Sequence, residues 1–192
     1  MKKALCLLIA VLLGLLCGCA DPSTYGAQIE NPYVRSSDVS SRPGPYEKDS
    51  LESWLQSGSG LVMVIAAVTG DTAERYMEDA QTPLPPVDFT PIRVEKLITV
   101  KDEDIPETGD GFVMADTYRG RVPELREGDR FAVLCIYNNA YEGYSPYAGA
   151  DSFFFITDKN RVFPYTDKES FAQYNNMPLK TFEKNVEAMM NP

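Results

Sequence analysis

The sequence predicts a mainly β fold, a small antiparallel β-barrel of five to six strands with short flanking helices. Apolar runs of strand length recur along the chain, and turn residues separate them. Helical spacing of apolar residues is found near the two ends of the folded part. The strands do not alternate with long helices, so hairpin connections are expected instead of βαβ units. A β-sandwich is the alternative arrangement that this pattern allows.

Export features occupy the first nineteen residues. Lys2 and Lys3 precede an apolar run from Ala4 to Leu16, which is the order of the parts of a signal peptide. The run is too short to span a bilayer core, which takes about 20 residues. The segment therefore predicts a secretory signal, with an uncleaved anchor as the alternative.

The signal ends in Leu16-Cys17-Gly18-Cys19. These four residues resemble the lipobox of bacterial lipoproteins. The resemblance implies that residues 1–18 are a lipoprotein signal peptide and that Cys19 is the acylated first residue of the mature protein. Two acyl chains or signals are needed for stable attachment. We therefore expect a lipid-anchored protein on the cell membrane, facing outside the cytoplasm. An ordinary secretory signal cut elsewhere is the alternative.

The remainder of the chain has the length of one domain with a core. Residues 19–48 contain four prolines among Ser, Asp, Asn and Gly, a composition typical of a flexible tether. As a coil, about 30 residues would span roughly 30 Å. Within it, packing of Asn31 to Val34 on the domain as an edge segment is an alternative. Residues 49–192 are predicted to form a single β-barrel domain with a C-terminal helix.

The domain begins with a predicted helix over 50–56, because Leu51, Trp54 and Leu55 share one helical face. An apolar strand buried on both faces is expected at 61–69. Three prolines mark 73–86 as a long loop. The further predicted strands are 93–100, 111–118, 130–137 and the hairpin pair 152–157 and 161–165.

The chain ends in a predicted helix. Pro178 suits a first helical position, and the residues that follow it place four apolar side chains on one stripe. These are Leu179, Phe182, Val186 and Met189.

Charge and cysteine content exclude two classes of protein. All 28 acidic residues lie after the signal peptide, and cleavage of the signal would remove Lys2 and Lys3. The mature chain would therefore carry a formal charge of −12. Nucleic-acid binders gather Lys and Arg on one face, so no nucleic-acid partner is expected. Cys135 is the one cysteine of the mature chain besides the acylated Cys19, so a fold built on disulfides is excluded. It lies in a strand-like run, where a buried, unreactive thiol is expected.

The chain contains no histidine, which excludes nucleophile systems that need a histidine base. Because Cys135 is the one thiol of the mature chain besides Cys19, zinc sites of Cys and His ligands are excluded as well. Paired carboxylates of the glycosidase kind remain open. Calcium at the acidic stretch 102–110, or at Asp158, Asn160 and Glu169, is another alternative, but Phe163 stands where such a loop needs glycine. We expect no metal and no cofactor.

Four tyrosines cluster between residues 137 and 147 among small and polar residues. They are Tyr137, Tyr141, Tyr144 and Tyr147. Tyrosine-rich loops serve in recognition because the ring offers rigid amphipathic contact area, so these residues are the candidate ligand-binding set. The alternative is that the rings cover a barrel mouth and complete the core.

Several segments resemble small barrel domains of uncharacterised bacterial lipoproteins, often from Gram-positive organisms. They are Val94–Ile98, Glu124–Val133, the Phe153–Ile156 strand with its hairpin, and the closing Pro178–Phe182 helix. The likeness covers residues 50–190. Those domains look like relatives of the oligonucleotide/oligosaccharide-binding (OB) barrel, and the resemblance implies an OB-like fold without any functional residues.

The sequence thus predicts a membrane-anchored extracytoplasmic domain that binds or interacts without catalysis. Its partner would be an envelope protein or a glycan, besides the membrane that holds the lipid anchor. The first alternative is a carboxylate-dependent hydrolase of the cell envelope. A structural accessory subunit is the second.

Overall fold

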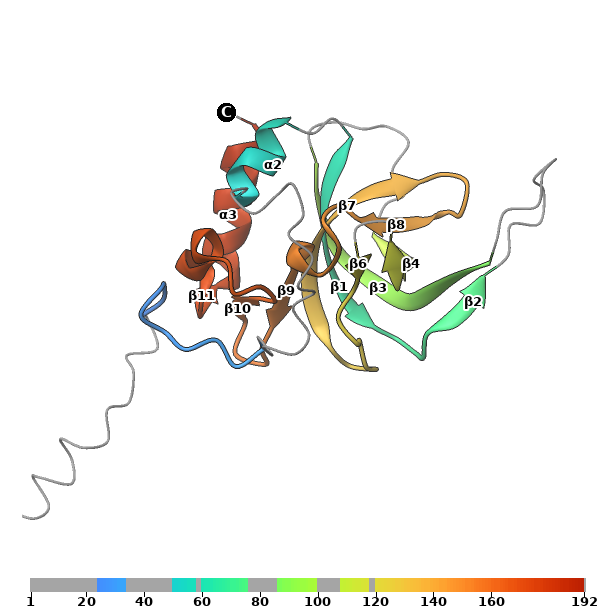
Figure 1. The fold of residues 1–192 in the computed structure, drawn as a ribbon, viewed down its shortest axis with the longest axis horizontal. Helices are drawn as coiled ribbons and strands as arrows, with labels where there is room; N and C mark the ends of the chain where they lie inside the picture. The colour runs from blue at the N-terminus through green and yellow to red at the C-terminus, as the bar shows by residue number, and fades with distance from the viewer. Residues whose placement is uncertain are drawn as a thin grey trace, which may run out of the picture.

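The computed structural model describes residues 24–33, 50–57, 60–75, 86–99, 108–117 and 120–191. Within these ranges the protein is mainly β, and a closed five-stranded barrel carries short helices along one side (Figure 1). The fold class predicted from the sequence is confirmed. The arrangement is the barrel and not the sandwich.

Five strands close the barrel: β1 (Leu61–Val68), β3 (Val87–Thr99), β4 (Gly109–Met114), β8 (Gly143–Pro146) and β7 (Arg130–Asn138). They follow one another around the ring in that order, because β1 pairs with both β3 and β7. The pairs are antiparallel except β4 and β8, which run parallel. This five-stranded Greek-key closure is of the OB type.

Shorter strands extend the sheet. Strand β9 (Phe153–Ile156) pairs with β7, and β10 (Arg161–Pro164) and β11 (Met177–Pro178) follow at the edge. The β9–β10 pairing confirms the predicted hairpin. Strand β2 (Ala73–Arg75) pairs with β3, while β5 (Asp116–Thr117) and β6 (Gly120–Arg121) form a separate pair.

The helical elements are α2 (Leu51–Ser57), η1 (Gly149–Ser152), η2 (Glu169–Tyr174) and α3 (Leu179–Met190). Helices α2 and α3 match the two predicted helices. On α3 the last fully buried residue is Met190, and Met189 is only partly buried. None of the helices in the described ranges is long and apolar enough to cross a bilayer.

Two hydrophobic cores lie on opposite faces of β1 and β7. Val62 and Val64 of β1 point into the barrel, and Met63 and Ile65 point to the layer formed by α2 and α3. Neighbouring residues of a strand alternate between its faces, so a strand covered on both sides is apolar throughout. This explains the unbroken apolar run that predicted a doubly buried strand.

Strand β3 begins earlier than the sequence predicts, at Val87 and not at 93. Pro91 lies inside it and lacks an N–H, which normally interrupts a strand. The Pro91 carbonyl accepts a hydrogen bond from the N–H of Thr69 at 3.0 Å, just beyond the end of β1. An antiparallel residue directs its N–H and C=O to the same neighbour. The N–H that Pro91 lacks would therefore point towards β1, at a position where the hydrogen-bond ladder between β1 and β3 has already ended.

Residues 24–33 belong to the segment interpreted from composition as a tether. They lie against β10, β11 and η2, with hydrogen bonds from Gly26 N to Asn175 O at 2.8 Å and from Asn176 Nδ2 to Thr24 O at 2.7 Å. Asn31 to Tyr33 thus contact the domain, as in the edge-segment alternative. The signal peptide, Cys19 and the rest of the tether lie outside the described residues.

Candidate functional site

The structure separates the four candidate tyrosines. Tyr144 is only 2% exposed and lies in the barrel core, with its ring 5.2 Å from that of Tyr137. Tyr147 packs at 6.1 Å on the ring of Trp54, in the core beneath the helices. Tyr141 lies 5.8 Å from the ring of Phe89. Tyr137 and Tyr144 are therefore brought together, whereas Tyr141 and Tyr147 have different surroundings.

Burial accounts for the ionisation behaviour of the first two rings. It raises the pKa of Tyr144 to about 12. Burial also raises the pKa of Tyr137, with a smaller contribution from the carboxylate of Glu142. Both phenols are neutral at physiological pH, so neither supplies a charged group to a ligand.

Tyr141 belongs to a group that we call the Arg75 cluster: Arg75, Phe89, Phe112, Tyr141 and Glu142. The Arg75 guanidinium carbon lies 4.4 Å from the centroid of the Phe112 ring and 5.9 Å from that of Phe89. Its Nη2 donates to Glu142 Oε2 at 3.2 Å. A guanidinium over an aromatic face is attracted by the ring quadrupole. The cluster thus joins one ion pair to a small aromatic surface.

The five members of the Arg75 cluster come from four different parts of the barrel. Arg75 ends β2, and Phe89 and Phe112 lie on β3 and β4. Tyr141 and Glu142 form the tight turn between β7 and β8, where the backbone N–H of Tyr141 donates to the carbonyl of Asn138 at 3.2 Å. The site therefore assembles only when the barrel closes.

Gly143 allows the turn to approach β3. A Cβ on Gly143 would lie 2.6 Å from Cε1 of Phe89 and 3.3 Å from the carbonyl oxygen of Phe112. Phe89 is 2% exposed and has little room to move. A residue with a side chain at this position would push the turn away from the aromatic rings.

The guanidinium of Arg75 retains hydrogen-bonding capacity. Its Nη1 is buried and has no hydrogen-bond partner in the part of the chain that the structure describes. The Arg75 side chain is 30% exposed, and that of Glu142 is 75% exposed. A buried donor left unpaired costs about 1–3 kcal/mol, so a side-chain shift that brings this nitrogen to an acceptor oxygen of water or a ligand would be favourable.

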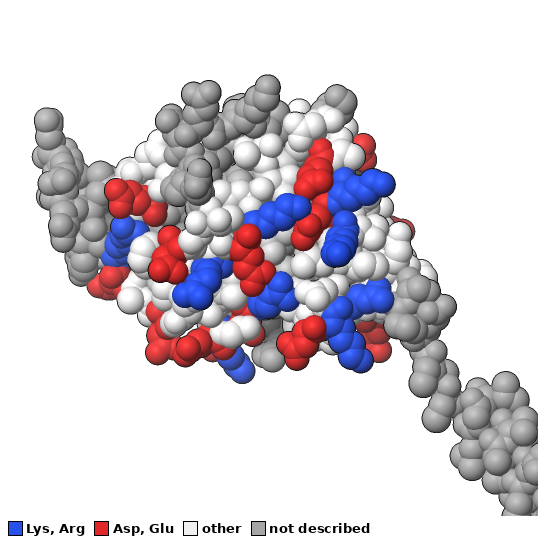
Figure 2. All heavy atoms as spheres, turned by 180° about the vertical axis from the view of Figure 1, so that it is seen from behind, with Lys and Arg blue, Asp and Glu red and all other residues white. Residues whose placement is uncertain are grey.

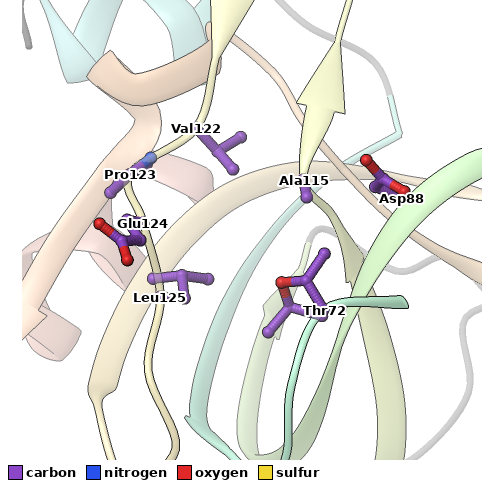
Figure 3. A pocket seen from close by; sticks show the side chains of 8 residues that line it. Thr72, Asp88, Ala115, Val122, Pro123, Glu124 and Leu125 are labelled. Carbon is purple, nitrogen blue, oxygen red and sulfur yellow. The ribbon is translucent and has the colours of Figure 1, made fainter. Parts of the chain in front are cut away.

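A pocket of about 290 Å³ lies where residues 122–125 pass the ends of β3 and β4 (Figure 3). Asp88 and Thr90 of β3 line it, and they alternate with Phe89, so the pocket and the Arg75 cluster lie on opposite faces of that strand. The hydroxyls of Thr72 and Thr90 are 2.8 Å apart. Glu124 lines the pocket from the other side (Figure 3).

Asp158 and Asn160 belong to the β9–β10 turn, in which the N–H of Asn160 donates to the carbonyl of Thr157 at 2.8 Å. Most of the acidic stretch 102–110 lies outside the described residues. Within the described ranges no group of three or more Cys, Asp or Glu side chains is placed to hold a metal ion. Cys135 is fully buried, and burial raises the pKa of its thiol well above the ordinary value.

Comparison of the chain with models of protein families, with curated proteins and with solved structures finds no match. The geometry of the site is therefore the basis for its function.

Four members of the Arg75 cluster were not predicted from the sequence: Arg75, Phe89, Phe112 and Glu142. Arg75 fell in the predicted long loop, and Phe89 preceded the predicted start of its strand. No local pattern links four residues that are up to 67 positions apart. Tyr141 is the one member of the Arg75 cluster that composition pointed to.

Proposed function

We propose that this protein is a membrane-anchored extracytoplasmic lipoprotein whose barrel is a non-catalytic binding domain. The ligand class that we propose is an oligosaccharide of the cell envelope, bound at the Arg75 cluster. One observation carries the proposal. The Arg75 cluster lies on the second and third barrel strands, β3 and β4, between the loop after β1 and the loop after β7. OB barrels bind oligonucleotides and oligosaccharides at this position.

The chemistry of the Arg75 cluster suits a sugar. Phe112 and Tyr141 are partly exposed and offer apolar ring surface. Arg75 and Glu142 offer a donor and an acceptor beside these rings, and hydroxyl groups satisfy both. Binding sites of this kind combine aromatic lining with a few polar groups that fix orientation.

Charge distribution supports a glycan over a nucleic acid. On the face seen from behind, Lys and Arg alternate with Asp and Glu (Figure 2). Ion pairs on the barrel surface include Arg130 with Glu95 at 2.7 Å and Arg93 with Asp110 at 3.6 Å. A phosphate backbone needs a continuous basic surface, whereas a neutral sugar does not.

The test measures binding of the full lipidated chain in detergent to peptidoglycan fragments and neutral envelope oligosaccharides by calorimetry. We expect Arg75→Ala and Tyr141→Ala to weaken binding by about tenfold or more, the effect of losing one charge-assisted hydrogen bond or one stacked ring. Arg126→Ala is the matched control, since the Arg126 side chain is 70% exposed and lies between β6 and β7, not on β3 or β4. Equal affinities for all four proteins, or turnover of any glycan, would contradict the proposal.

A second candidate is the carboxylate-dependent envelope hydrolase, which one observation favours. Asp88 and Glu124 line the same pocket and come from different segments (Figure 3). Glycosidases work with two carboxylates on either side of the scissile bond. Glycan turnover that is lost in both Asp88→Asn and Glu124→Gln would favour this function over the first.

A further inference from the structure

The segment Thr24–Tyr33 is fastened to the domain at two places. At its beginning, Asn176 Nδ2 donates to the carbonyl of Thr24 at 2.7 Å, and Asn175 Nδ2 donates to the carbonyl of Ile29 at 3.1 Å. Gly26 N donates to the Asn175 carbonyl at 2.8 Å. Asn175 is only 7% exposed. These bonds come from two consecutive asparagines, so one short stretch after η2 holds half of the segment.

The other end of Thr24–Tyr33 is held by an aromatic ring. Tyr33 stacks on Phe155 with the centroids 4.9 Å apart and the planes at 5°, and it lies 5.7 Å from Phe163. Asn31 Nδ2 donates to the carbonyl of Pro164. The segment thus lies against one face of the β9–β10 pair, because Phe155 and Phe163 are cross-strand partners.

This attachment limits the reach of the lipid anchor. Five residues lead from Cys19 to Thr24, and a chain spans at most about 3.3–3.6 Å per residue, which gives about 17 Å. A free coil of 30 residues would place the domain roughly 30 Å away on average and in any orientation. With Thr24–Tyr33 attached, the side of the domain that carries η2, β10 and β11 stays next to the anchor.

We propose that the attached segment Thr24–Tyr33 orients the domain on the bilayer, with the η2, β10 and β11 side against the lipid surface and the Arg75 cluster turned away from it. In Figure 1 this segment lies beside β10 and β11, whereas β2 and the β7–β8 turn lie on the opposite side of the molecule. Tyr25, a 40% exposed aromatic residue of the segment, is of the type enriched at membrane–water interfaces. The inference depends on the proposed lipid anchor at Cys19.

Energy transfer from Trp54 to vesicle lipids with dansyl headgroups tests the proposal. Trp54 is the one tryptophan of the sequence, and its ring lies 5.3 Å from that of Phe171 in η2, on the side proposed to face the bilayer. The full lipidated chain is reconstituted into the vesicles. We expect transfer to fall at least twofold in the variant Asn31→Ala, Tyr33→Ala, Asn175→Ala, Asn176→Gly, which loses the side-chain contacts at both ends of the segment. The domain then moves on a 30-residue coil.

A second variant and a control make the result specific. Asn176→Gly removes the bond to Thr24 from the domain side and keeps the left-handed backbone at φ 60°, so it should lower transfer in the same direction. Gln28→Ala is the control, since Gln28 is exposed and its amide bonds within the segment, to the Tyr25 carbonyl. Energy transfer in the Gln28→Ala variant should equal that in the wild type. Circular dichroism checks that every variant is folded.

The failures are distinguishable. If the wild type and the variants sediment with the vesicles and transfer energy equally, the orientation is wrong and the lipid anchor stands. If the wild type does not sediment with vesicles, the anchor and the orientation both fail.

Discussion

At the level of single residues, two tyrosines of one stretch have different roles because they are buried to different depths. Tyr144 completes the barrel core, and Tyr141 lies at its surface on Phe89. Both belong to one tyrosine-rich stretch of the sequence. Tyr141 is the member of this stretch that belongs to the Arg75 cluster, so the recognition hypothesis now concerns Tyr141, whereas the core alternative describes Tyr144.

Gly143→Ala should destabilise the protein by about 1–3 kcal/mol, the usual cost of overpacking. Its new methyl group would lie 2.6 Å from Cε1 of the buried Phe89 ring. Urea unfolding measures the change. Gly111→Ala is the control, because a methyl there would meet Tyr144 at an ordinary 3.4 Å, and it should cost less than half as much. Equal losses in the two variants would show that the close approach is not the cause.

Tyr144→Phe should reduce the decrease in unfolding free energy that the protein shows at alkaline pH. Burial raises the pKa of Tyr144 from 10.0 to about 12, so above pH 10 the unfolded chain releases this proton before the folded one does. The folding stability that is linked to the Tyr144 proton is fully present below pH 10. It is lost as the pH rises towards 12, at up to about 1.4 kcal/mol per pH unit. Unfolding free energies of both proteins at pH 9.5 and 11.5 test this. An unchanged slope in the variant would contradict it.

At the scale of elements, α3 fastens the C-terminus to the barrel in two ways. Phe182 is fully buried and lies 4.8 Å from the ring of Phe154. Lys96 of β3 reaches Glu183 and Glu187 of α3 at 2.8 Å each. Burial lowers the pKa of Lys96, but the two carboxylates outweigh this and raise it. Because Lys96 is 38% exposed, the apolar contact contributes most of the stability.

Phe182→Ala should therefore cost about 3–5 kcal/mol, as truncation of a core aromatic does. Lys96→Met should cost about 1 kcal/mol or less. Chemical denaturation of these two variants compares the apolar contact with the ion pairs. Lys180→Ala, at an exposed position on the same helix, is the control. A larger loss for Lys96→Met than for Phe182→Ala would reverse this ranking.

Elements with strong local patterns were predictable. The residues of β1 and β7 form continuous apolar runs because both faces are covered, and α2 and α3 each show one apolar stripe. Strand β8 was missed because Gly143–Pro146 carries tyrosine, serine and proline without apolar alternation. Its pairing with β7 and β4 creates the strand.

At the scale of the whole molecule, the two cores share their central strands. Residues of β1 and β7 contribute alternately to the barrel core and to the core beneath the helices. Neither core can lose these strands and remain intact. The described domain should therefore unfold as one cooperative unit.

Phe131→Ala tests this coupling. Phe131 is fully buried in the barrel core, whereas Trp54 lies in the other core. The substitution should lower the midpoints measured by far-ultraviolet circular dichroism and by Trp54 fluorescence by the same amount. Fluorescence that keeps the wild-type midpoint would show that the helical layer unfolds independently.

The fold class, the helices at both ends of the domain, the main strands and the lack of histidine could all be recognised from the chain's composition and local patterns. These properties follow from composition and from periodicity within one segment. The barrel closure through β8, the assembly of the Arg75 cluster and the attachment of Thr24–Tyr33 became visible with the three-dimensional arrangement of the chain. Each of these depends on hydrogen bonds and ring contacts between distant segments, whose register leaves no pattern within either segment alone.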